Sequence, residues 1–75
     1  MDELFRILEE LRPDVDFRHE DKLFTNRILD SFDIVTLVGE LNSGFDIGIN
    51  EEELVPENFD SAEAMWRLIK RLKEE

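Results

Sequence analysis

The sequence has no cysteine, a single histidine and no apolar run long enough to cross a membrane. Without cysteine, the chain can form neither a disulfide nor a zinc site with thiolate ligands. The first residues, MDELFRILEEL, are acidic and amphipathic, which is not typical of a signal peptide. A chain of 75 residues is expected to form one domain, residues 1–75, whose small core leaves little room for a deep enzymatic cleft. We therefore expect a cytoplasmic, monomeric protein that does not insert into membranes.

Basic residues are missing from the middle of the chain. From Ile28 to Trp66 there is no Lys or Arg, although the segment holds ten of the 20 acidic residues in a chain of formal net charge −11. Binding to nucleic acid requires clustered basic side chains, so nucleic acid is not an expected partner. The acidic segment is either a solvated surface that favours solubility or a docking surface for basic proteins.

Apolar residues at helical spacing predict three main helices. The first contains Leu4, Leu8 and Leu11 and is expected to end near Arg12, because Pro13 disfavours helical geometry in the residue before it. The second is predicted to begin at Ser31 and to stop at Gly44. Its expected buried face is the set Phe32, Val35, Val38, Leu41 and Phe45, with Ile34 and Leu37 near it.

The last main helix is predicted within FDSAEAMWRLIKRL, where Asp60 and Glu63 have the spacing of a capping box. Residues 13–29 are expected to form a long ordered loop, FDIGI a second loop, and NEEELVPENF a short helical turn. The predicted fold class is all-α, an antiparallel four-helix bundle of three main helices and one short helix, with a long first loop. Its core is expected to include four large aromatic residues, namely Phe32, Phe45, Phe59 and Trp66.

The dipeptide Asp30-Ser31 stands where the second helix is expected to start. Backbone N–H groups are unpaired at a helix start and the helix dipole is positive there, so a phosphate attached to Ser31 would be stabilised. Ser31 is therefore a candidate for covalent modification. The alternative interpretation is an ordinary N-cap, for which serine is a preferred residue.

Catalytic and metal-binding patterns are weak. His19 lies in a polar acidic segment, and no GxSxG motif accompanies Ser31, so nucleophilic catalysis by Ser31 is not expected. The segment DIGINEEELVPE, from Asp46, partly matches an EF-hand loop. However, Gly48 replaces the third-position ligand and Glu51 replaces the required glycine, so no metal site is expected.

Three segments in order, LDSFDIVTLVGEL, FDIGI and PENFDSAEAMWRLI, closely resemble the acyl carrier protein family. The resemblance covers most of the chain from Leu23 onward. It implies a four-helix bundle with a long first loop and with phosphopantetheine as a covalent cofactor on the serine that begins the second helix, here Ser31. It also implies that a phosphopantetheinyl transferase uses coenzyme A and Mg²⁺ to modify Ser31.

The resemblance further implies a carrier that is not itself an enzyme. The thiol of its cofactor would hold an acyl or aminoacyl group as a thioester, loaded by a ligase and passed to downstream acyl-processing enzymes. These partners would recognise the second helix, where Asp30, Asp33 and Glu40 are the expected docking acids. Phe32 stands where leucine is usual, and Thr36, Asn42, Ser43 and Gly44 stand where acids are common.

The RILDSF segment lacks the frequent glycine before the motif and looks more like stand-alone carriers such as the D-alanyl carrier protein. A specialised carrier is therefore favoured over one for general fatty acid synthesis. The alternative is an unmodified, acidic helical module that binds a basic protein partner. Modification of Ser31 distinguishes the two.

Overall fold

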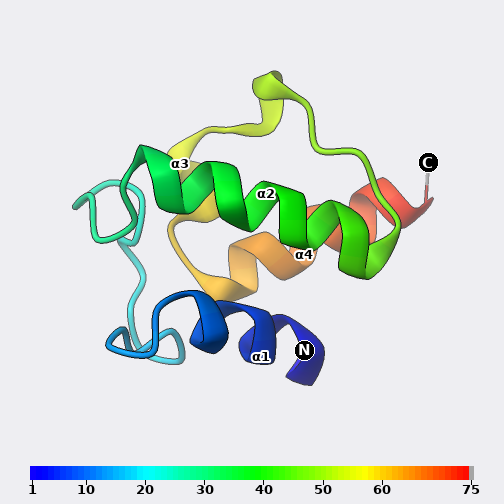
Figure 1. The fold of residues 1–75 in the computed structure, drawn as a ribbon. Helices are drawn as coiled ribbons and strands as arrows, with labels where there is room; N and C mark the ends of the chain where they lie inside the picture. The colour runs from blue at the N-terminus through cyan, green and yellow to red at the C-terminus, as the bar shows by residue number, and fades with distance from the viewer. Residues whose placement is uncertain (75) are drawn as a thin grey trace.

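A computed structural model describes residues 1–74, whose regular structure is entirely helical (Figure 1). This confirms the predicted all-α class. The elements are α1 (Asp2–Leu11), α2 (Ser31–Phe45), the 3₁₀ turn η1 (Glu51–Glu53), α3 (Pro56–Phe59) and α4 (Ala62–Glu74). The predicted short helical segment therefore contains two elements, η1 and α3, where one turn was expected.

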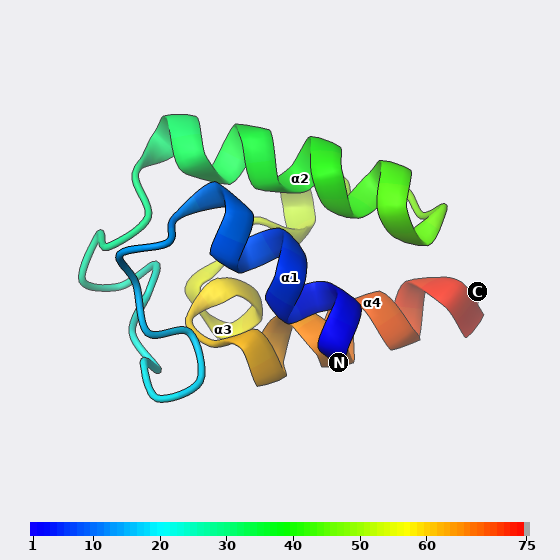
Figure 2. The same ribbon diagram turned by 60° about the horizontal axis from the view of Figure 1, so that its bottom comes forward.

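The three long helices lie side by side, with α1 running opposite to α2 and α4 (Figures 1 and 2). Helix α1 contacts both α2 and α4, and α3 packs against α4. Because α2 and α4 run in the same direction, the chain must return along the molecule between them. Residues 46–61 make this return through η1 and α3.

The long first connection, residues 12–30, contains no helix or strand but is anchored in the core. Phe17, Leu23 and Leu29 are each at most 3% exposed, which confirms the expectation of a loop held by its apolar residues. These side chains belong to the same core cluster as residues of α1, α2 and α4. The loop is therefore anchored in the core immediately before α2 begins.

Asp60 and Ser61 do not play the roles that the capping-box spacing predicts. The hydroxyl of Ser61 caps α4 by accepting a hydrogen bond from the Ala64 N–H at 3.0 Å. The Asp60 carboxylate instead accepts from the Phe24 N–H at 3.0 Å and from the N–H and hydroxyl of Thr25, each at 2.7 Å. The predicted Asp60 cap was wrong, because Ser61 provides the cap and the Asp60 carboxylate is engaged by Phe24 and Thr25.

Helix α2 buries a face shifted from the predicted one, with Leu41 buried as predicted and Val38 and Phe45 partly buried. Ile34, Leu37 and Leu41 are buried, whereas Phe32 is 76% and Val35 70% exposed. The helix is apolar on more than one side, so periodicity alone does not determine which side faces the core. Phe32 is therefore not a core aromatic residue.

The other three aromatic residues assigned to the core do contribute to it. Phe59 is fully buried. Phe45 and Trp66 are partly buried and pack edge to face, with ring centroids 6.0 Å apart. They join the end of α2 to the middle of α4.

Helix α2 continues past the predicted stop at Gly44. Its C-cap is Asp46, which has a left-handed backbone (φ 56°) and donates its N–H to the carbonyl of Asn42. Gly44 lies inside the helix, where a Cβ would stand 3.2 Å from Ile7 Cδ1. A larger residue at this position would therefore require the end of the Ile7 side chain to move by a few tenths of an ångström.

Candidate functional site

Ser31 is the first residue of α2 and is exposed. The N-cap is Asp30, whose Oδ1 accepts from the Asp33 N–H at 2.8 Å, while Asp33 Oδ2 accepts from the Asp30 N–H at 3.3 Å. The alternative interpretation of Ser31 as the N-cap was therefore wrong. Ser31 is exposed at the helix start, and among residues 1–74 no hydrogen-bond partner engages its hydroxyl.

An open hollow of about 520 Å³ lies beside Ser31. It is lined mainly by apolar side chains from the end of the long loop, from the first turn of α2 and from the segment after η1. Arg27 and Asp30 supply its charged side chains. The apolar lining consists of Phe24, Leu29, Ile34, Val35 and Leu54. A covalent group on Ser31 therefore has an apolar surface within reach.

Arg12, at the C-cap of α1, connects that helix to the start of α2. Its Nη1 donates to Asp33 Oδ2 at 2.6 Å and to the Ile28 carbonyl at 3.1 Å. Its Nε and Nη2 donate to the two carboxylate oxygens of Asp14, each at 3.0 Å. Hydrogen bonds to Asp14 and Asp33 raise the pKa of Arg12 above its usual value, and Arg12 lowers the pKa of Asp14.

These contacts correct the expected role of Asp33. Its side chain is only 12% exposed and is paired with Arg12, so it does not present a carboxylate to a docking partner. Sequence reasoning missed Arg12 because its partner lies 21 residues away and no local spacing links them. Among the expected docking acids, Glu40 is exposed on α2, and Asp30 is exposed but also serves as the cap.

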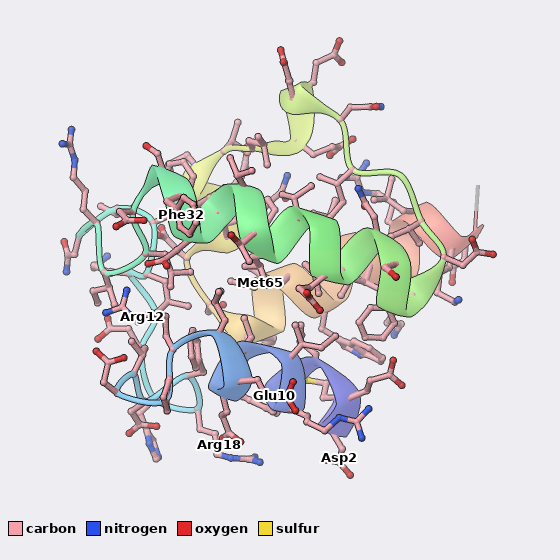
Figure 3. All side chains as sticks on the ribbon, in the orientation of Figure 1. Asp2, Glu10, Arg12, Arg18, Phe32 and Met65 are labelled. Carbon is pink, nitrogen blue, oxygen red and sulfur yellow. The ribbon has the colours of Figure 1, made fainter. Side chains whose placement is uncertain are left out.

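Two exposed apolar side chains lie close to Ser31 in the sequence of α2. Phe32 is on the first turn, near the end of the molecule where Arg12 lies (Figure 3). Val35 is one turn further along and also lines the hollow. The two side chains place apolar area on the exposed side of α2 beside Ser31.

The structure does not bring His19 to Ser31. His19 contacts Asp16 at 2.8 Å in the long loop and lines a separate hollow with Phe5 and Trp66. This contact lowers the pKa of Asp16. Within residues 1–74, no group of three or more His, Asp or Glu side chains is arranged to hold a metal ion.

Comparisons of the chain with protein-family models, with curated proteins and with solved structures find no match. In the part of the chain that the structure describes, no helix is both long and apolar enough to span a membrane. Function is therefore inferred from Ser31 and its surroundings.

Proposed function

We propose that this chain is a carrier protein of the acyl carrier type, with phosphopantetheine attached to Ser31. The observation that carries the proposal is the accessible Ser31 hydroxyl on the first residue of α2, where Asp30 performs the capping role. A serine used only as a cap would have its hydroxyl engaged by the backbone. Here Asp30 is the residue that caps the helix, so the Ser31 hydroxyl is not used for capping.

The helix start suits the chemistry of attachment. The first N–H groups of α2 and the positive end of its dipole stabilise a phosphate bound to Ser31. The Ser31 oxygen would form a bond to the phosphorus of coenzyme A that carries the pantetheine, and the pyrophosphate P–O bond would break. The products are modified Ser31 and adenosine 3′,5′-bisphosphate. A separate transferase with Mg²⁺ would take up the hydroxyl proton and stabilise the leaving group.

The surroundings of Ser31 fit the attached group. The hollow of about 520 Å³ offers an apolar surface for the arm, which when bound supplies the thiol that holds an acyl or aminoacyl group. The all-helical chain with a long first loop, three long helices and the short α3 contains the elements that the proposed carrier fold requires. In this proposal the protein itself catalyses nothing and acts as a cytoplasmic monomer.

Partner enzymes would approach the exposed side of α2. Phe32 and Val35 provide apolar contact area, while Glu40 and Asp30 provide negative charge near Ser31. The partners in this proposal are the phosphopantetheinyl transferase, a loading ligase and downstream acyl-processing enzymes. Basic surfaces on these enzymes would complement the acidic segment.

The same exposed apolar side chains also favour a second candidate, an unmodified helical module that binds a basic protein. Phe32 and Val35 are 76% and 70% exposed and lie on adjacent turns of α2, so they offer apolar area for a partner. The two candidates share a docking surface and differ in the use of the Ser31 hydroxyl. Modification of Ser31 therefore decides between them.

The test is incubation with coenzyme A, Mg²⁺ and a broad-specificity phosphopantetheinyl transferase, followed by intact-mass measurement. The wild-type protein is expected to gain the mass of one phosphopantetheinyl group. Ser31→Ala should gain nothing, while Ser43→Ala, which alters another exposed serine of α2, should behave as wild type. An unchanged wild-type mass with several such transferases would contradict the carrier proposal and favour the interaction module.

A further inference from the structure

We propose that Arg12 is a positioning residue that holds Ser31 in the geometry required for its modification. This inference rests on the proposed carrier function and adds a residue from α1 to the site. Arg12 does not touch Ser31. It acts through the residues on either side of Ser31, namely Ile28 and Asp33.

A single nitrogen of Arg12 anchors both ends of the segment 28–33. Nη1 donates to the Ile28 carbonyl before Ser31 and to the Asp33 carboxylate after it. The same oxygen of Asp33 accepts the N–H of Asp30, so the anchor continues directly into the capping box. The segment that carries Ser31 is thus attached to the end of α1 at two points, the Ile28 carbonyl and the Asp33 carboxylate, and the capping box links Asp33 to Asp30.

Asp14 fixes the direction of the Arg12 guanidinium group. Its two oxygens accept from Nε and Nη2, which leaves Nη1 directed at Ile28 and Asp33. This use of three nitrogens requires the planar fork of arginine, because a lysine ammonium has one nitrogen and cannot hold both groups in fixed directions. The Arg12 side chain is only 29% and the Asp33 side chain 12% exposed, so solvent offers limited replacement for the pair.

The segment needs such an anchor because it has a strained entry. Arg27, immediately before Ile28, has a left-handed backbone (φ 56°), which is unfavourable for a residue with a Cβ. The hollow beside Ser31 is open, so it does not enclose the segment. Within residues 28–30, the Leu29 side chain is buried and its N–H donates to the Leu23 carbonyl at 3.1 Å, and Ile28 packs against the core. Arg12 adds a contact from the end of α1 to the Ile28 carbonyl, and Asp33 accepts the N–H of Asp30.

Removing the anchor should affect turnover more than binding. Arg12→Gln leaves Phe32, Val35 and Glu40 in place for docking but lets the Ser31 backbone move. A misplacement of about 1 Å can reduce a rate by about 100-fold. We therefore expect the transferase kcat with Arg12→Gln to fall by roughly 10- to 100-fold, while KM changes by less than about threefold.

Three variants separate positioning from charge and from general stability. Arg6→Gln removes the same charge from an exposed position of α1, and Leu72→Ala weakens the packing of α4; both should retain the wild-type kcat. Arg12→Lys, which keeps the charge, should remain well below wild type. The double variant Arg12→Gln, Asp33→Asn should lower kcat by no more than the stronger of the two single variants, because both substitutions break the same hydrogen-bonded pair.

A second readout does not depend on the transferase. Amide hydrogen exchange of residues 30–34 should be faster in Arg12→Gln than in Arg6→Gln, with α4 amides unchanged. If wild type is modified and Arg12→Gln has the kcat and exchange rates of Arg6→Gln, the positioning role is overturned and the carrier function stands. If the wild-type protein is not modified, both the carrier function and the positioning role of Arg12 are rejected.

Discussion

The Asp60 carboxylate ties the start of α4 to the long loop by three hydrogen bonds, from the amides of Phe24 and Thr25 and from the Thr25 hydroxyl. Partial burial alone would raise the pKa of Asp60. The donors, with a smaller contribution from Lys22, outweigh burial and hold the pKa below its usual value. The folded protein therefore binds this proton more weakly than the unfolded chain does.

This difference predicts a pH-dependent role for Asp60 in stability. Its contribution is fully present above the unfolded pKa of 3.8 and is lost as the pH falls through the lower folded value. Asp60→Asn should lower the free energy of unfolding by about 1–2 kcal/mol at pH 7. The gap from wild type should narrow below about pH 4.

Urea denaturation at several pH values measures this gap. Asp21→Asn, which alters an exposed acid of the same loop, serves as the control and should show little effect at pH 7. A gap for Asp60→Asn that stays constant from pH 7 into the acid range would show that the charge of Asp60 is not what matters.

At the scale of single residues, local patterns predicted the position of Ser31 but not its surroundings. The Asp-Ser pair and the apolar spacing after it placed Ser31 at a helix start, which the structure confirms. Which of the two residues accepts the capping hydrogen bond depends on backbone angles that the sequence does not specify. Asp33 lies 21 residues from Arg12, and Phe24 and Thr25 lie 35 or more residues from Asp60, so only the folded chain brings these partners together.

Helix α2 shows why an element can be predicted while its orientation is not. Its start at Ser31 was predicted and its end lies one residue past the predicted stop, but its apolar residues form two neighbouring stripes. One contains Ile34, Leu37 and Leu41, and the other contains Phe32 and Val35. The structure turns the first stripe inward, and Asp33, beside it, reaches Arg12. The sequence did not indicate that Asp33, at the edge of an apolar stripe, would be buried and paired with Arg12.

The burial of α2 can be tested with two truncations two residues apart. Leu37→Ala removes a fully buried side chain and should lower the free energy of unfolding by about 2–5 kcal/mol. Val35→Ala removes a side chain that is 70% exposed and should change it by no more than about 0.5 kcal/mol. Chemical denaturation measures both values, and a larger loss from Val35→Ala would contradict the observed orientation of the helix.

At the scale of the whole molecule, the charge distribution favours partners with basic surfaces. The stretch without bases, residues 28–66, includes all of α2, η1 and α3, and its acids carry the excess negative charge. Exposed charges act over about 10 Å at 0.1 M salt, so docking to this surface should weaken as salt is added. Because α2 carries the exposed Glu40, that residue tests the surface without disturbing the core.

We expect Glu40→Lys to reduce the kcat/KM of modification by roughly two- to fivefold, corresponding to about 0.5–1 kcal/mol. The kcat/KM of the wild-type protein should also fall as salt is added, and the difference in kcat/KM between wild type and Glu40→Lys should become smaller. Glu9→Lys makes the same charge change at an exposed position of α1 and should have a smaller effect. Equal effects of the two substitutions would indicate that net charge, and not the α2 surface, controls association.

The measurement that tests the central claim most directly is localisation of the modification by tandem mass spectrometry. The wild-type protein, treated with coenzyme A, Mg²⁺ and a phosphopantetheinyl transferase, is digested and its serine-containing peptides are sequenced. The carrier account predicts one phosphopantetheinyl group, on Ser31, in the wild-type protein and in Ser43→Ala, and none in Ser31→Ala. A group found on Ser43 or Ser61, or no group on any peptide, would contradict the account.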